Sequence, residues 1–287
     1  MNETFTRFDT AVEKFASMRK PTIAFGMQEP DREILESLER SKKYADIILV
    51  GPEAIQNISG FTVVVDSAPE EKIAHMLVSG EISGFVRGTI DDFKTNEAYL
   101  KLSGASGEED LPSILQDPTG RIFMLSPLSN PQGWSKEERL HIAKGLAAFA
   151  ATWGIPVKIA VYTGVRHETF KRKGDITEGV AGILNQTYRD AEWIVEELMK
   201  DGVDAKNWSI DFDLAARDGY TIHVPVNGMV GNQMFRVLLL CGGKILIGTR
   251  SMSPHIREDN SRNEKDFDFH VKWLAALINK KASEGRL

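Results

Sequence analysis

Several classes of protein are excluded by what this sequence of 287 residues has little of. Its single cysteine, Cys241, cannot form a disulfide within the chain, as expected for a protein of the reducing cytoplasm. Residues 1–20 lack the apolar core of a signal peptide, and no uninterrupted apolar run approaches the roughly 18 residues that a membrane-spanning helix needs. We therefore expect a cytoplasmic protein that does not bind a membrane.

Excess positive charge and metal-ligand spacing are absent as well. Lysine and arginine total 35 against 41 aspartates and glutamates, and the net charge of −6 argues against nucleic-acid binding. The six histidines show no ligand spacing and one cysteine cannot complete a zinc site, so no metal is expected. The sequence also lacks G-x-G-x-x-G, G-x-x-x-x-G-K-[ST] and G-x-S-x-G motifs, and any glycine-rich loop typical of S-adenosylmethionine binding.

What the chain does contain is a regular alternation of short apolar runs and segments of helical period. The runs are rich in β-branched residues and mostly continuous, as in strands covered on both faces. They lie at residues 22–25, 46–50, 62–65, 84–86, 122–125, 157–162, 221–224 and 244–248. Helices are predicted at residues 31–43, from 69 onward, and at 136–152, 177–200 and 265–280. Ser67 and Ser135, each followed three residues later by glutamate, are predicted to cap two of these helices. The pattern predicts an α/β fold with largely parallel sheets and helices on both faces.

The length exceeds that of one typical domain, and two clusters of turn-forming residues divide the chain. Proline, glycine and asparagine gather at residues 127–134, and the return crossing is predicted near Gly242–Thr249. We therefore predict a discontinuous first domain of residues 1–133 with 245–287, and a second domain of residues 134–244.

Positive charge follows several of the predicted strands, at the strand ends where open α/β sheets form their ligand crevice. The loop after strand 157–162 carries Arg166 together with Thr163 and Gly164, which offer an anion a hydroxyl and close backbone approach. Arg87 closes strand 84–86 in the same way. The alternative interpretation of such residues is a solvated basic loop.

A second group of candidates surrounds an apolar segment that looks like buried core. Asn232, after Gly231, is either an ordinary helix cap or the start of a helix whose free N–H groups bind an anion. Arg236, one turn later, would add positive charge on the same face. Thr249 and Arg250 then place a hydroxyl beside a guanidinium, which suits phosphate or carboxylate; the alternative is a polar turn. Together the candidates favour a cleft for a small anionic substrate.

The order of these segments resembles the phosphate acetyltransferase and phosphate butyryltransferase family. That family's opening strand, helix and strand are similar to PTIAFG…DREILESL…ADIILVGP, and a later strand end to SGEISGFVRGTI. Two further blocks resemble IFMLSPLSNPQGWSKEERLHIAKGLAAFAATWGIPVKIAVYTG and VPVNGMVGNQMFRVLLLCGGKILIG. Gly231 and Asn232 stand on the family's Gly-Asn pair, Arg236 where it has lysine, and Thr249-Arg250 where it has Ser-Arg. Within the family, the chain is most similar to the methanogenesis marker protein 4 group of methanogenic archaea, which is labelled methyltransferase subunit X.

The resemblance implies two domains with the substrate in the interdomain cleft, a homodimer, and acyl transfer between coenzyme A and phosphate. Thr249 would take the place of the serine, and Arg250 would bind phosphate. The family's base is an aspartate seven positions after its serine, where this chain has Ile256. Three functions are compatible with these residues. The first is a methanogenesis-associated transferase of the phosphotransacetylase type that binds a phosphate- or coenzyme A-bearing molecule. The second is a methyltransferase component with partner subunits, and the third is a noncatalytic ligand-sensing or accessory subunit.

Overall fold

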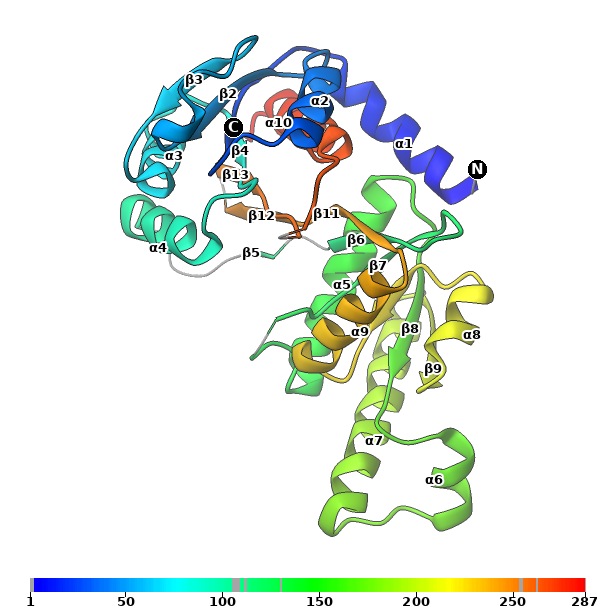
Figure 1. The fold of residues 1–287 in the computed structure, drawn as a ribbon. Helices are drawn as coiled ribbons and strands as arrows, with labels where there is room; N and C mark the ends of the chain where they lie inside the picture. Colours follow the sequence, from blue (N-terminus) through cyan, green and yellow to red (C-terminus); the bar gives the residue numbers. More distant parts are fainter. Residues whose placement is uncertain are drawn as a thin grey trace. The chain divides into compact units, whose positions relative to one another are not determined.

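The computed structural model describes residues 3–104, 109–110, 113–129, 131–252, 255–261 and 263–286, without the side chains of residues 109–110 and 249–252. The chain divides into two compact units, whose elements are labelled in Figure 1. Met1–Phe8 and Pro112–Lys244 form what we call the middle unit, and Asp9–Leu111 with Ile245–Leu287 form the terminal unit. Helix α1 (Glu3–Ala16) spans the division near the N-terminus.

The terminal unit has a seven-stranded sheet in the order β3-β2-β1-β4-β13-β12-β5. Strands β3 to β13 run parallel to their neighbours, whereas β12 pairs antiparallel with both β13 and β5. The strands are β1 (Thr22–Gly26), β2 (Asp46–Gly51), β3 (Thr62–Val65), β4 (Gly84–Val86), β5 (Glu109–Asp110), β12 (Thr249–Met252) and β13 (His255–Glu258). Helix α2 (Arg32–Ser41) packs with α10 (Asp268–Ser283), and α3 (Pro69–Val78) with α4 (Asp92–Ser103). A short 3-10 helix, η1 (Glu53–Ile55), lies between β2 and β3.

Both faces of this sheet are covered, because successive side chains of β1 pack into different layers. Ala24 belongs to a core cluster with Ile73 and Leu77 of α3. The ring of Phe25 instead lies 4.8 Å from the ring of Phe267, beside α10. Side chains alternate between the two faces of a strand, so a continuous apolar run is required where both faces are buried. The predicted α/β fold with largely parallel sheets is confirmed.

The second sheet has six strands in the order β11-β6-β7-β10-β8-β9, and all of them lie in the middle unit except the last three residues of β11. Strands β7, β10, β8 and β9 run parallel, and β6 is antiparallel to β7. The strands are β6 (Ser113–Gln116), β7 (Ile122–Leu125), β8 (Lys158–Tyr162), β9 (Asp204–Ser209), β10 (Ile222–Val224) and β11 (Lys244–Ile247). The helices are α5 (Lys136–Thr152), α6 (His167–Lys173), α7 (Gly179–Lys200), α8 (Phe212–Arg217) and α9 (Gly228–Leu240).

Neighbouring strands β8 and β10 mark the point where the connections of the middle sheet reverse direction. The chain leaves β8 toward β9 at one edge of the sheet, whereas it leaves β10 toward β11 at the opposite edge. Open α/β sheets bind ligands outside the carboxyl ends of strands at such reversal points. The loops after β8 and β10 are therefore where a ligand of this unit is expected.

The first crossing between the units lies earlier in the chain than the predicted one at residues 133/134. β6 pairs with β7, and β7 pairs with β10, so residues 113–125 belong to the sheet of the middle unit. The division falls after Leu111, and the return falls after Lys244. The difference arises because these two strands complete the middle sheet instead of extending the first one.

All of the predicted strands and helices are present, and the unpredicted strands are short or polar. They are β5, β6, β9, β12 and β13, and helices α1, α4, α6 and α8 were not predicted either. Ser135 caps α5 as predicted, because its hydroxyl accepts the N–H of Glu138 at 3.1 Å. The predicted cap at Ser67 is wrong: the N-cap of α3 is Ala68, without a side-chain hydrogen bond.

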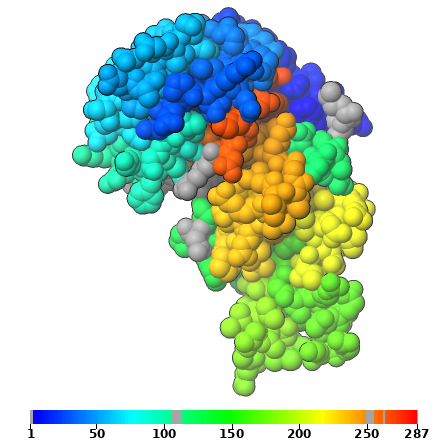
Figure 2. All heavy atoms as spheres, in the orientation of Figure 1, coloured from blue at the N-terminus to red at the C-terminus, as the bar shows by residue number. Residues whose placement is uncertain are grey.

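Helix α9, which looked like buried core in the sequence, lies at the surface, where Figure 2 shows its segment in orange. Val237 is 58% exposed and Leu240 is 86% exposed, whereas Phe235 is buried. An apolar composition all around a helix therefore does not indicate complete burial here. One face of α9 packs on the unit and the other faces outward.

Candidate functional site

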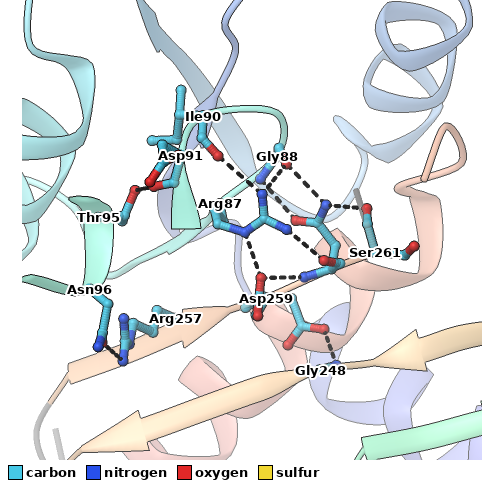
Figure 3. A network of polar contacts seen from close by, with 12 residues as sticks. Arg87, Gly88, Ile90, Asp91, Thr95, Asn96, Gly248, Arg257, Asp259 and Ser261 are labelled. Carbon is cyan, nitrogen blue, oxygen red and sulfur yellow. Dashed lines mark hydrogen bonds and ion pairs between the residues drawn. The ribbon is translucent and has the colours of Figure 1, made fainter. Parts of the chain in front are cut away.

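Arg87 follows β4 and is buried in a polar network of the terminal unit (Figure 3). Its Nε donates to the carboxylate of Asp259 at 2.5 Å, and its Nη2 donates to the carbonyl of Asn260 at 2.5 Å. Its Nη1 donates to the carbonyls of Gly88 and Ile90, each at 3.1 Å. Every nitrogen of the guanidinium has a protein acceptor, so Arg87 ties β4 to the segment after β13. Binding of an anion by Arg87 stays a prediction, and it would require one of these acceptors to be exchanged.

The reversal point of the terminal sheet, between β1 and β4, is closed by backbone contacts. The N–H of Thr89 donates to the carbonyl of Gly26 at 2.9 Å, and its hydroxyl accepts the N–H of Gln28 at 2.8 Å. Gly88 has a φ of +64°, and a Cβ at this position would overlap the carbonyl oxygen of Gly26. Only glycine adopts this backbone conformation without strain and allows such a close approach. The two strand ends therefore lie in direct contact.

A small hollow of about 10 Å³, room for roughly one water molecule, adjoins this network and is partly open to solvent. It is lined by Phe85, Arg87, Asp92, Thr95, Arg257, Glu258 and Asp259. Arg257 donates through Nη2 to the side-chain oxygen of Asn96 at 2.6 Å, and its guanidinium lies 4.9 Å from the centre of the Tyr99 ring. The hollow thus combines two guanidinium groups with three carboxylates. Its carboxylates outnumber its guanidinium groups, so it differs from the anion-attracting cleft that the sequence predicts.

Glu258, at the end of β13, is a buried carboxylate that sequence reasoning did not select. Its Oε1 accepts the N–H of Gly248 at 2.7 Å and lies 2.8 Å from Nδ1 of His270 on α10. The side chains of Glu258 and His270 are 0% and 1% exposed. Buried carboxylates need such partners, because desolvation penalises an unpaired charge. Its sequence signal was its place two residues after Ile256, near the position of the family's base.

The backbone register of the β12–β13 hairpin relates Glu258 to the predicted catalytic pair. Thr249 lies opposite Glu258, and Arg250 lies opposite Arg257. Residues opposite each other in an antiparallel pair are adjacent in the backbone ladder. The side chains of Thr249 and Arg250 are outside the described residues, so their predicted roles stay predictions. Ile256, at the position where the family has its base, is fully buried.

In the middle unit, the predicted anion-binding loop after β8 has its own N–H groups already engaged. The N–H of Thr163 donates to the carbonyl of Ser209 at 2.8 Å, and that of Gly164 donates to the hydroxyl of Thr187 at 2.7 Å. The hydroxyl of Thr163 donates to the carbonyl of Val165 at 2.6 Å. These bonds fix the loop, and anion binding by Thr163, Gly164 and Arg166 stays a prediction. Arg166 follows the loop, exposed, at the N-cap of α6.

The helix predicted to begin at Gly231-Asn232 begins three residues earlier, at Gly228. Its N-cap is Asn227, whose side chain accepts the N–H of Val230 at 3.0 Å. The N–H of Gly228 donates to the carbonyl of Gln132 at 2.8 Å, and that of Gly231 to the carbonyl of Asn227 at 3.0 Å. The interpretation of Asn232 as the cap is therefore wrong, because Asn227 offers an extended backbone and a side-chain acceptor at the true start.

Gly231 and Asn232 instead hold the chain after β7. The amide of Asn232 donates to the carbonyl of Leu128 at 3.0 Å, and a Cβ on Gly231 would overlap the carbonyl oxygen of Pro127. Arg236, in the next turn, is exposed, with its guanidinium 5.3 Å from the centre of the Phe235 ring. The Gly-Asn pair thus joins α9 to the loop after β7. Anion binding by these three residues stays a prediction.

Arg139 on α5 is a buried cation that sequence reasoning missed. It is 2% exposed, and its Nη2 donates to the carbonyl of Tyr162, the last residue of β8, at 2.7 Å. Its Nε is buried without a hydrogen-bond partner. Burial lowers the pKa of Arg139 to about 10, while the charge of Asp190 opposes that shift. The available signal was its position four residues before Ala143, on the apolar face of the helix.

Two further features are absent from the described residues. No group of three or more His, Cys, Asp and Glu side chains there is placed to hold a metal ion. No helix among them is long and apolar enough to cross a membrane.

Relatives of known name match most of the chain. A protein of Methanosarcina barkeri named "Putative methyltransferase mtx subunit X" is 26% identical over 269 residues, which cover 91% of this chain and 95% of that protein. An "Uncharacterized methyltransferase" of Methanocaldococcus jannaschii is 30% identical over 225 residues, covering 76% of this chain and 81% of that protein. The chain belongs to the family of the archaeal mtx subunit X proteins. No family model matches it.

Solved structures place this mtx subunit X family member in a fold shared with phosphotransacylases. A branched-chain phosphotransacylase from Enterococcus faecalis has a TM-score of 0.63 at 15% identity and covers 89% of this chain and 99% of its own. A phosphotransacetylase from Streptococcus pyogenes has a TM-score of 0.65 at 12% identity and covers 99% of this chain and 100% of its own. The resemblance to the phosphate acetyltransferase-like family is confirmed at the level of fold.

Proposed function

We propose that this protein is a transferase of methane-forming archaea that acts on a small molecule bearing a phosphate or coenzyme A group. The observation that carries the proposal is the likeness in fold to phosphotransacylases over 89% to 99% of the chain. Arg250 in β12 supports it, because a guanidinium group matches phosphate oxygens in geometry and charge.

In acyl transfer to coenzyme A, a base takes the thiol proton, the thiolate attacks the acyl phosphate carbonyl, and the bond to phosphate breaks as phosphate leaves. Arg250 would neutralise the departing phosphate, and Thr249 would donate its hydroxyl to the developing oxyanion. The position of the family's base is filled by Ile256, which has no proton-accepting group. The carboxylate opposite Thr249 is Glu258, and we assign it the role of base.

Ligand-induced thermal stabilisation tests this proposal on the purified chain. A ligand that binds only the folded state raises the melting temperature in a concentration-dependent way. Coenzyme A or acetyl phosphate should raise it, and Arg250→Ala should remove that shift. A coupled assay of acetyl phosphate with coenzyme A should then show turnover that Glu258→Gln abolishes while the fold, followed by circular dichroism, remains. If neither coenzyme A nor acetyl phosphate stabilises the protein, the proposal fails.

A second candidate, a methyltransferase component acting with partner subunits, is favoured by the names of the relatives. In this case a methyl donor such as S-adenosylmethionine, or an acceptor such as coenzyme M, should stabilise the protein and coenzyme A should not. Transfer of a labelled methyl group, alone and with lysate fractions of a methanogen, would distinguish this component from a noncatalytic accessory subunit. We also propose a homodimer, which light scattering during size-exclusion chromatography tests directly.

A further inference from the structure

No ion pair among the described residues neutralises the charge of Arg139. No carboxylate lies within ion-pair distance of its guanidinium in the part of the chain that the structure describes, and its Nε has no hydrogen-bond partner. At 2% exposure, the side chain is almost entirely removed from bulk solvent. A buried guanidinium normally has a carboxylate or several carbonyl acceptors, because the cost of desolvating the charge is otherwise not recovered.

Arg139 lies at a place in the fold where a ligand is expected. Its guanidinium is bonded to the carbonyl that ends β8, and β8 lies beside β10 at the reversal point of the middle sheet. Helix α6 follows the same strand end and ends with the exposed run Lys171-Arg172-Lys173. A basic segment raises the local concentration of anions near such a strand end.

Asp190 on α7 is the residue that could compensate Arg139 from within the chain. Its charge acts on Arg139, yet its carboxylate is beyond ion-pair distance and accepts the side-chain N–H of Gln186 at 2.6 Å. Asp190 therefore compensates part of the charge without satisfying the donors. An incoming anion would meet the unpartnered Nε of Arg139 and would be repelled by Asp190.

We propose that Arg139 binds a compact oxyanion, the phosphate or carboxylate group of a small ligand, at the carboxyl end of β8. The planar guanidinium offers parallel N–H donors that match two oxygens of either group. This site needs no particular transfer chemistry, so it can stand even if the proposed acyl transfer does not. Its residues also differ from Thr249, Arg250 and Glu258, to which that chemistry is assigned.

The test compares wild type with Arg139→Met, which keeps the length of the side chain and removes the charge. Without ligand, Arg139→Met should melt at the same temperature as wild type or higher, because an uncompensated buried charge is replaced by an apolar group. Inorganic phosphate and acetate, each titrated against chloride at equal ionic strength, separate a phosphate ligand from a carboxylate ligand. At least one of them should stabilise wild type, and Arg139→Met should bind it roughly 10- to 100-fold more weakly.

Three further variants keep the result interpretable. Arg217→Met on α8 makes the same exchange at a side chain 69% exposed in the same unit, and it should bind the anion like wild type. Asp190→Asn should bind the anion more tightly, because it removes a repulsive charge. If Arg139→Met does not fold, Arg139→Lys retains the charge without the planar donors and should still weaken binding.

Several results would overturn the proposal. One is equal destabilisation by Arg139→Met and Asp190→Asn without any anion effect, which would make the two residues a structural pair. Another is unchanged anion binding in Arg139→Met or Arg139→Lys. A third is no stabilisation of wild type by either anion. Stabilisation by phosphate with no response to coenzyme A or acetyl phosphate would retain this site and reject the proposed acyl transfer.

Discussion

The two units each bury an arginine beside the end of a parallel strand, and they treat its charge differently. Arg87 of the terminal unit is 6% exposed and has acceptors for all three nitrogens, including the carboxylate of Asp259. Arg139 of the middle unit is 2% exposed and has the carbonyl of Tyr162 as acceptor for Nη2, with Nε unpartnered. Burial alone therefore does not distinguish a structural arginine from one that binds a ligand. The hydrogen-bond acceptors around the guanidinium distinguish the two.

The largest effect should come from exchanging the satisfied arginine. Arg87→Met leaves the Asp259 carboxylate and the Asn260 carbonyl without their donor, and it should lower the free energy of unfolding by about 3–5 kcal/mol. Urea unfolding followed by circular dichroism measures this loss. Arg139→Met is the matched comparison, with an expected change near zero. Equal losses in the two variants would remove the distinction between the arginines.

One added methyl group should separate the ends of β1 and β4 at the reversal point of the terminal sheet. Gly88→Ala requires an alanine at a φ of +64° and displaces the carbonyl of Gly26, so it should cost about 2–4 kcal/mol. Gly80→Ala is its control, because Gly80 has a φ of +78° but nothing within 4 Å of an added Cβ. The control should cost about 1 kcal/mol. If both variants lose the same stability, the contact between β1 and β4 contributes nothing beyond backbone strain.

The corresponding contact of the middle unit lies between α9 and the loop after β7. Gly231→Ala pushes against the carbonyl of Pro127 and should destabilise by about 1–3 kcal/mol. Gly145→Ala, at an exposed position of α5 with open space around it, should instead stabilise by about 0.5–1 kcal/mol through helix propensity. Thermal unfolding of the two variants gives the comparison. A stable Gly231→Ala protein would show that the Gly-Asn segment is not fixed by packing.

The smallest effect, taken per pH unit, is the pH dependence of the free energy of unfolding that a histidine of the middle unit causes. Burial lowers the pKa of His223 from 6.5 to about 3, and its Nδ1 lies 2.6 Å from the hydroxyl of Tyr162. Above pH 6.5 the imidazole is neutral in both states, so its contribution is fully present. As the pH falls from 6.5 toward 3, the unfolded chain binds a proton that the folded chain excludes. Stability should then fall by about 1.4 kcal/mol per pH unit. Urea unfolding between pH 6.5 and 4.5 should show a shallower slope for His223→Gln, and an unchanged slope would contradict this role.

The sequence predicts the fold well where burial leaves a simple pattern. A strand covered on both faces must be apolar throughout, and β1, β2, β7 and β8 could be recognised for that reason. Strand β9, DAKNWS, lies at the edge of its sheet and mixes buried with exposed residues, so it has no continuous apolar run. β12 and β13 are a polar hairpin whose pairing depends on partners distant in the sequence.

The candidate sites were harder to predict, because a charged residue looks the same in sequence whether or not its charge is already satisfied. Arg87 was selected for following a strand, but its four acceptors come from two segments far apart in the chain. Arg139 was overlooked because a single arginine in a helix is usually solvated. The helix start at Asn227 was missed because Asn232 matched a family pair, although both asparagines have suitable side chains.

The pairing of β5 with β12 bears on how the residues between these two strands are inserted in the chain. Asp110 lies opposite Arg250 in that ladder, so the strand before the middle unit and the strand after it are direct neighbours in one sheet. An insertion whose two ends emerge side by side can be added or removed with little disturbance to its host. Residues 112–244 of the middle unit are thus one continuous insertion in the sequence between strands β5 and β12 of the terminal unit. Joining residue 110 to residue 250 through a short glycine-containing turn should yield a shortened chain that keeps the sheet of the terminal unit. Circular dichroism measures this, and a random-coil spectrum would show that the terminal unit does not fold without the middle unit.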